Sequence, residues 1–311
     1  MSRNKRLPTV LGGLGAIVVL GAGASFAVGG QPDKTRQAQS ALHGGEAKNV
    51  IFFLGDGMGD SEVTAARYYQ YGAAGRMNID RLPLTGFQTT WSVKPAASAP
   101  YTPDYDPDSA STGTMWATGE KTIDERISQG PSSAEDVPGK NLQTILERAQ
   151  RQGKRTGNVS TAEITDATPA VLNAHMSLRG CQGPQDTATS CPTETKAAGG
   201  LGSIAEQTVD HEVDVVLGGG RARFQQTVVG GPDDGKTVEQ YAQDRRGYTE
   251  VTDAAGLDAA GRSDRPLLGL FAQGNMTTEW SGPQASRGDG TPPQRCAVSY
   301  THLTLPTILL V

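Results

Sequence analysis

The chain has 311 residues, of which 36% are hydrophobic, and a formal net charge of −5. This length and apolar content are sufficient for a substantial core in one large domain or two ordinary ones. The acidic balance argues against a nucleic acid or an anionic membrane as partner, although a small anion could still bind in a local positive pocket.

Residues 1–27 have the pattern of a secretory signal peptide. Three basic residues near the start precede a short apolar stretch, 11–20, and the tripeptide SFA at 25–27 offers a small-x-small cleavage site. An uncleaved membrane anchor is the alternative, but the apolar stretch is about half as long as a transmembrane helix. We expect a secreted protein, periplasmic or extracellular, with 25 basic and 33 acidic residues after cleavage, a net charge of −8. Residues 28–47 lack hydrophobic periodicity and are predicted to form a disordered leader.

The first predicted strand, 49–55, is followed by a carboxylate between two glycines. In the segment GDGMGD, Asp56 comes directly after the strand, and a helix is predicted over 59–71. Glycines let the backbone turn tightly and approach a ligand, and a carboxylate on a rigid strand end suits zinc or a hard cation. Ordinary turns use the same residues, so the motif alone leaves both interpretations open.

A second candidate is Ser109, which begins a predicted helix directly after Asp108. A serine hydroxyl at a helix N-terminus lies near uncovered N–H groups and the positive end of the helix dipole. Both favour an alkoxide and an incoming phosphate. The alternative is that these residues simply cap the helix.

Polar residues also follow the next predicted strand, 157–161. Asp166 and Thr168 place a carboxylate and a hydroxyl two residues apart, before a helix predicted over 169–177, so both could contact one hard cation. Arg179 follows this helix, and a guanidinium can bind two phosphate oxygens in a fork geometry. Helix capping and a favourable interaction with the helix dipole are the alternatives for these residues.

Two cysteines, Cys181 and Cys191, lie close together in a polar loop. Their spacing suits a local disulfide in an oxidising compartment. A zinc-binding pair is the alternative, although the spacing is wide for a metal knuckle.

The remaining pattern alternates helices and strands. Helices are predicted over 141–152 and 203–211, and short apolar strands over 213–218 and 267–272. Continuously apolar short runs are typical of parallel strands buried on both faces. The sequence therefore predicts an α/β fold, a three-layer α/β/α sandwich with a mostly parallel sheet, in which ligands bind beyond the carboxyl ends of the strands.

The end of the sequence differs in character. Cys296 has no partner, and the segment 298–311 (VSYTHLTLPTILLV) resembles a translated sequencing adapter, so we leave it out of the fold prediction as a non-native tail. A C-terminal strand is the alternative interpretation of this segment.

Five blocks of sequence resemble, in order and spacing, the bacterial alkaline phosphatase family. They are KNVIFFLGDGMGDSEVTAAR, DSASTGTMWATGEKT, TGNVSTAEITDATPAVLNAHMSLRGC, VDVVLGGG and LLGLFAQGNM. The resemblance implies that residues 48–297 form the N-terminal part of an alkaline phosphatase domain, incomplete in its sheet. It also implies that Cys181 and Cys191 form a disulfide and that Cys296 is half of another.

For the chemistry, the resemblance implies that Ser109 is the nucleophile that becomes phosphoserine. Arg179 would clamp the phosphate, and Asp108 would orient the arginine. The implied reaction is an in-line displacement at a phosphate monoester, in which zinc lowers the pKa of the serine hydroxyl and stabilises the departing alkoxide. Water bound to zinc would then cleave the phosphoserine.

The implied cofactors are two zinc ions and one magnesium ion. Asp56 would bridge a zinc and the magnesium, Ser109 would contact zinc, and Asp166 and Thr168 would bind magnesium. The family's other ligands, a glutamate, aspartates and three histidines, lie further along than this chain reaches, so we expect the chain itself to be inactive. The resemblance also implies that the full-length protein is a homodimer. The four histidines are not expected to assemble a zinc triad: His43, His175, His211 and His302.

Two alternative functions remain. A metal-dependent sulfatase or phosphodiesterase shares the plan of a nucleophile at a helix start, and a non-catalytic exported binding protein could retain the scaffold alone. The DSA motif, the following TGxKT and Arg179 favour phosphate monoesters.

Overall fold

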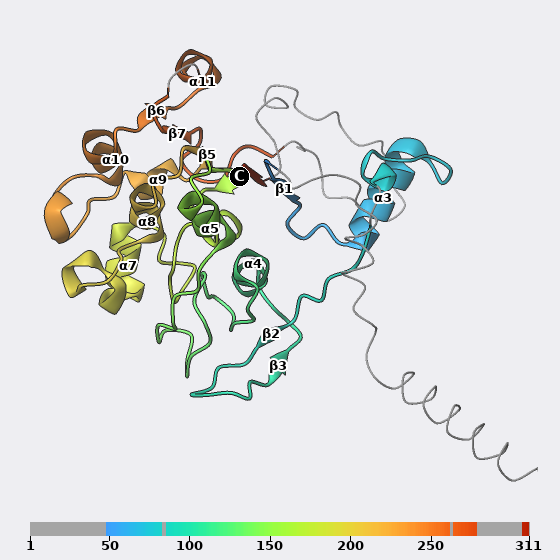
Figure 1. The fold of residues 1–311 in the computed structure, drawn as a ribbon, viewed down its shortest axis with the longest axis horizontal. Helices are drawn as coiled ribbons and strands as arrows, with labels where there is room; N and C mark the ends of the chain where they lie inside the picture. Colours follow the sequence, from blue (N-terminus) through green and yellow to red (C-terminus); the bar gives the residue numbers. More distant parts are fainter. Residues whose placement is uncertain (1–47, 83–84, 262–263, 279–306, 311) are drawn as a thin grey trace, which may run out of the picture. The chain divides into compact units, whose positions relative to one another are not determined.

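The computed structural model describes residues 48–82, 85–261, 264–278 and 307–310 (Figure 1). The predicted signal peptide and leader, Cys296 and most of the segment 298–311 lie outside these residues. All helices and strands given below belong to one structural unit, Lys48–Leu82 with Gly86–Val311. Within the described part of the chain, none of the helices has the length and apolar character needed to cross a membrane.

The main sheet has six strands in the order β1-β8-β4-β5-β7-β6. The strands are β1 (Ile51–Leu54), β4 (Gly157–Glu163), β5 (Val215–Gly219), β6 (Thr249–Val251), β7 (Leu267–Leu270) and β8 (Thr307–Leu310). Four neighbours, β4, β5, β7 and β6, are parallel, whereas β8 runs antiparallel between β1 and β4. A separate pair, β2 (Ser92–Val93) and β3 (Pro103–Asp104), is antiparallel. The prediction of a mostly parallel sheet is confirmed.

All four predicted strands are present, as β1, β4, β5 and β7. The sequence did not indicate β6, because a strand of three residues with one buried position is too short to show a pattern. β8 comes from the segment 298–311, which we left out of the fold prediction, and its backbone pairing matches the alternative of a C-terminal strand. The adapter-like origin of the segment stays a prediction.

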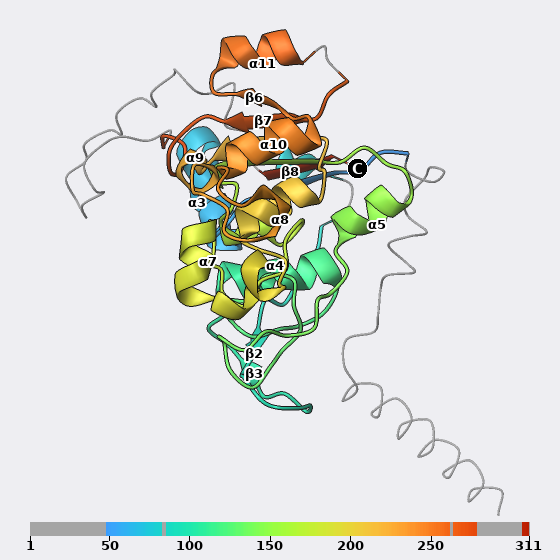
Figure 2. The same cartoon turned by 90° about the vertical axis from the view of Figure 1, so that its left-hand side faces the viewer.

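Helices cover both faces of the sheet. In the strand order, β5 lies on one side of β4, and β6 lies on the same side of β5. The connection from β6 to β7 runs in the opposite direction across the sheet. Because parallel crossovers are right-handed, the helices of the first two connections must lie opposite the helix of the third. Figure 2 shows α8 (Ile204–Asp210) and α10 (Val238–Arg246) on one side and α11 (Ala254–Ala260) on the other. The predicted three-layer arrangement is confirmed.

Two predicted helices have different bounds in the structure. The helix predicted from residue 141 begins at Ile145, because Thr144 and Glu147 form a capping box at that point. The helix predicted over 169–177 ends early, because Met176 pairs with Ile127 in an antiparallel bridge. The remaining helices are α3 (Asp60–Tyr71), α4 (Ser109–Thr118), α5 (Ile145–Arg151), α6 (Ala167–Ala170), α7 (Pro184–Ser190) and α9 (Arg221–Phe224), with 3₁₀ turns η1 (Ile79–Arg81), η2 (Pro192–Glu194), η3 (Lys196–Ala198) and η4 (Gly231–Asp233).

The hydrophobic core joins the sheet to the helices that follow it. Its fully buried side chains include Leu146, Ile164, Leu172 and Ile204. Burying one such side chain stabilises a protein by about 1.5–3 kcal/mol. By contrast, α3 buries no residue. The chain around α4, β4 and α6 is therefore the firmly packed part of the unit, and it carries most of the candidate site residues.

Cys181 and Cys191 form a disulfide, as expected, so the zinc-pair alternative is wrong. The bond joins the two ends of the segment that contains α7, and both residues are buried. A cross-link over so short a loop restricts the unfolded chain and stabilises the fold by about 3 kcal/mol.

We expect the double variant Cys181→Ser, Cys191→Ser to lower the free energy of unfolding by about 2–3 kcal/mol, measured by urea denaturation under non-reducing conditions. Adding a reductant to the unmodified chain is the matched control and should give the same shift. An unchanged urea midpoint in the double variant would show that the cross-link does not constrain the unfolded chain.

Candidate active site

Ser109 is the first residue of α4, and Asp108 caps this helix. The backbone of Asp108 is extended, with φ −86° and ψ 175°, and its Oδ1 accepts a hydrogen bond from the backbone N–H of Ser111 at 2.9 Å. The first N–H groups of a helix have no partner within the helix and carry partial positive charge. The Ser109 hydroxyl therefore lies where an anion is favoured.

Arg179 connects three of the candidate residues through its guanidinium group. Nη1 donates to Ser109 Oγ at 2.9 Å and to Asp108 Oδ2 at 3.2 Å, and Nη2 donates to Asp166 Oδ1 at 2.8 Å. Burial lowers the pKa of Arg179, but the hydrogen bonds and charges of Asp166 and Asp108 outweigh burial and raise it overall. A permanent cation that donates to the Ser109 oxygen favours the deprotonated form of that hydroxyl.

Asp56 lies in the turn after β1 and contacts the chain that follows β4. The turn uses Gly57 at φ +63°, a conformation that residues with a side chain rarely adopt. Thr168 Oγ1 donates a hydrogen bond to Asp56 Oδ2. β1 and β4 are both antiparallel to β8, so their carboxyl ends lie at the same edge of the sheet. This is where ligands bind in open α/β sheets, as the sequence analysis expected.

A cleft of about 410 Å³ brings these side chains together. Asp56, Ser109 and Thr168 line it, and Trp116 of α4 forms part of its wall. The rings of Trp116 and Phe52 pack with centroids 5.0 Å apart, which joins α4 to β1 across the cleft wall. The hydrogen bonds of Arg179 add the other candidates, so the cleft and its immediate surroundings contain all six predicted residues: Asp56, Asp108, Ser109, Asp166, Thr168 and Arg179.

Glu125, which the sequence did not indicate, contacts both Asp108 and Arg179 through its backbone. Its N–H donates to Asp108 Oδ2 at 3.2 Å, and its carbonyl oxygen accepts from the backbone N–H of Arg179 at 2.7 Å. Glu125 adopts the left-handed region at φ 65°, which is uncommon for a residue with a side chain. Burial raises the pKa of its carboxyl, and the charge of Asp108 raises it further. No periodicity or motif marks this position in the sequence.

The oxygen atoms in and beside the cleft suit a hard cation as ligands. Asp56 supplies a carboxylate oxygen, and Thr168 and Ser109 supply hydroxyl oxygens. Asp166, which Arg179 contacts beside the cleft, supplies a second carboxylate. Magnesium prefers such an all-oxygen set. Zinc also accepts carboxylate oxygen but commonly takes nitrogen or sulfur ligands, and none of the described residues lining the cleft is a histidine or cysteine.

The chain is similar in sequence to proteins of known function. The sequence profile of the alkaline phosphatase family matches residues 47–295. The chain is 49% identical over 251 residues to the streptomycin-6-phosphate phosphatase of Streptomyces griseus, covering 81% of this chain and 53% of that protein. It is 46% identical over 257 residues to the alkaline phosphatase of Escherichia coli K12, covering 82% of this chain and 52% of that protein.

Among solved structures, a cold-active alkaline phosphatase from a psychrophilic Shewanella species matches 72% of this chain and 46% of its own. The identity is 27% and the TM-score is 0.49. The chain spans about half the length of the curated relatives it matches.

Proposed function

Because the chain belongs to the alkaline phosphatase family, we propose that it is part of an enzyme that hydrolyses phosphate monoesters through a phosphoserine at Ser109. One observation carries the proposal. The Ser109 hydroxyl at the start of α4 accepts a hydrogen bond from the guanidinium of Arg179. A nucleophile and a group that binds phosphate oxygens in a fork geometry are thus held side by side.

In the proposed reaction, Ser109 Oγ attacks the phosphorus of the ester. The Oγ–P bond forms as the P–O bond to the departing alcohol breaks, and water then cleaves the Oγ–P bond and restores the serine. Arg179 and the first N–H groups of α4 bind the nonbridging oxygens, whose charge must be stabilised in the transition state. Asp108 and Asp166 hold the guanidinium in this orientation through their hydrogen bonds.

The proposal includes two zinc ions and one magnesium ion. Asp56, Asp166 and Thr168 would hold the magnesium, and Asp56 and Ser109 would contact zinc. When bound, the ions would lower the pKa of the serine hydroxyl, stabilise the departing alkoxide and activate water. A catalytic zinc usually takes about three protein ligands, whereas Asp56 and Ser109 are the residues of this cleft that would contact zinc. We therefore propose that the 311-residue chain by itself is inactive or nearly so.

Export is part of the same proposal. The pattern of residues 1–27 supports a signal peptide, and the buried disulfide between Cys181 and Cys191 is of a kind that persists in oxidising compartments. Dimerisation of the full-length protein rests on the resemblance to the family and stays a prediction.

An assay of three esters separates the proposed function from its alternatives. A protein extended to the length of its relatives should hydrolyse p-nitrophenyl phosphate with a kcat/KM at least roughly 10²-fold above that for p-nitrophenyl sulfate. Faster hydrolysis of the sulfate would indicate a sulfatase, and hydrolysis of bis(p-nitrophenyl) phosphate in preference to the monoester would indicate a phosphodiesterase. A folded protein that cleaves none of the three would be a binding protein.

A further inference from the structure

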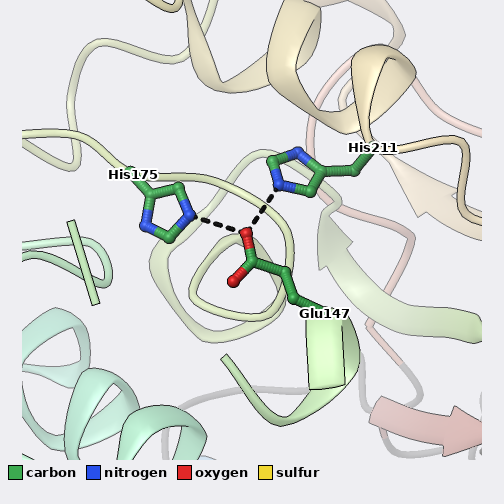
Figure 3. Close-up of side chains that lie close together, drawn as sticks. All are labelled: Glu147, His175 and His211. Atoms are coloured by element: carbon green, nitrogen blue, oxygen red, sulfur yellow. Dashed lines mark hydrogen bonds and ion pairs between the residues drawn. The ribbon is translucent and has the colours of Figure 1, made fainter. Parts of the chain in front are cut away.

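Outside the cleft, three side chains from different elements converge on one point (Figure 3). Glu147 comes from α5, His211 from the end of α8, and His175 from the chain between α6 and α7. Both ring atoms His175 Nε2 and His211 Nε2 lie 2.9 Å from the same oxygen, Glu147 Oε1. Both histidines fall in helices predicted from the sequence, and neither was expected to join a zinc triad.

Backbone contacts fix the tautomer of each ring. His175 Nδ1 lies 2.8 Å from the carbonyl oxygen of Ser128, and His211 Nδ1 lies 2.9 Å from the carbonyl oxygen of Gln207. A carbonyl oxygen can only accept, so each Nδ1 carries the hydrogen, and in a neutral ring Nε2 then has a free lone pair. Histidines that bind metals are oriented in the same way, with the other ring nitrogen donating to a carbonyl or carboxylate.

Both rings direct Nε2 at the same oxygen of Glu147. An ionised carboxylate only accepts hydrogen bonds, and a neutral ring whose hydrogen is on Nδ1 has no hydrogen to donate from Nε2. One divalent cation between the three atoms would accept both lone pairs and offset the charge of the carboxylate.

Two of the three distances between candidate ligand atoms are close to those around a coordinated zinc ion. Ligand atoms around a tetrahedral zinc lie roughly 3.3 Å apart, given zinc–nitrogen and zinc–oxygen bonds of about 2.0–2.1 Å. Each Nε2 lies 2.9 Å from Oε1, so these pairs would have to separate by a few tenths of an ångström. The two Nε2 atoms lie within 4.8 Å of each other, so the rings would also have to approach each other by up to roughly 1.5 Å to share one ion.

Neighbouring groups hold the ligands in place. The second carboxylate oxygen, Glu147 Oε2, accepts from the backbone N–H of Thr144 at 2.9 Å, so Oε1 is the oxygen that faces the rings. Gln207 Oε1 accepts from the backbone N–H of His175 at 2.8 Å and ties that segment to α8.

We propose that Glu147, His175 and His211 form a binding site for one divalent transition-metal ion, and that Zn²⁺ is the ion that best matches two imidazoles and a carboxylate. The site is separate from the cleft that contains Ser109, and the bound ion links α5, α8 and the segment before Arg179. A water molecule completes its coordination.

Cobalt provides the direct test, because Co²⁺ in a four-coordinate site absorbs visible light and Zn²⁺ displaces it. The full 311-residue chain, stripped of metal with a chelator, is titrated with Co²⁺. We expect one equivalent of Co²⁺ to produce visible absorption bands. The variants His211→Ala and Glu147→Gln should weaken Co²⁺ binding at least roughly 10-fold. Glu212→Gln, which changes the charge next to His211 but removes no ligand, should bind as the unmodified chain does. Asp56→Asn should also bind Co²⁺ with unchanged affinity, which would show that the metal site is distinct from the cleft that contains Ser109.

Two outcomes would overturn the proposal: no cobalt bands in the unmodified chain, or unchanged affinity in both ligand variants. Circular dichroism shows whether each variant is folded. If a variant does not fold, X-ray absorption at the zinc edge of the unmodified, zinc-loaded chain tests the proposal. The site requires two imidazole nitrogens around one ion, so a spectrum with oxygen ligands alone would contradict it.

Discussion

Replacing Ser109 with alanine in a protein of full family length is expected to abolish formation of a phosphoenzyme and to lower kcat/KM for p-nitrophenyl phosphate at least about 10³-fold. The variant lacks the atom that would form the covalent bond, and groups that remain around it give only residual catalysis. Trapping with labelled phosphate at low pH, followed by peptide mapping, measures the first effect, and steady-state kinetics measures the second.

Ser111 provides the matched control for this experiment. It lies two residues further along α4, but it is buried, and its hydroxyl contacts Asp108 Oδ1 and Asp124 Oδ1, both at 2.9 Å. The variant Ser111→Ala should therefore still trap phosphate at Ser109. Label on Ser111 in the Ser109→Ala protein, or undiminished trapping in that protein, would show that the nucleophile has been assigned wrongly.

Arg179→Lys is expected to lower kcat/KM about 10²–10³-fold in the same protein and to weaken inhibition by inorganic phosphate. Arg179 uses two nitrogens to reach Ser109, Asp108 and Asp166, whereas lysine has one nitrogen and no fork geometry. Losing a preorganised donor to the transition state typically has an effect of this size.

Arg223→Lys is a suitable comparison for that variant. Arg223 is also half-buried and pairs with two acids, Glu163 and Asp186, but it does not line the cleft. Its replacement should leave phosphate inhibition unchanged. If Arg179→Lys and Arg223→Lys gave equal inhibition constants for phosphate, Arg179 would have no part in binding the anion.

Local sequence signals indicated residues of the candidate site but left their roles open. Asp56 directly follows an apolar strand, and Ser109 begins a helix with an acidic cap, so each side chain has a position that short-range patterns define. Topology then brings them together, because parallel strands place their carboxyl ends at one edge. Five blocks in family order added the roles that such patterns leave open.

The features that the sequence did not reveal depend on contacts between distant segments. Glu125 belongs to no regular element, and its left-handed backbone is unexpected for a glutamate. His175 and His211 are separated in the chain by a disulfide loop and α8, and they meet at Glu147, which lies 28 residues from one and 64 from the other. The helix predicted over 169–177 failed for a similar reason, since its apolar residues reflect burial from all sides and not one helical face.

The position of β8 also has a consequence for Asp56. Among the described strands, β8 is the one sheet partner of β1, and it lies between β1 and β4. Two strand spacings, roughly 9–10 Å, therefore set how far apart the backbones leading to Asp56 and Asp166 run. The separation of the two carboxylates that we propose as ligands of one ion therefore depends on a strand that supplies neither of them.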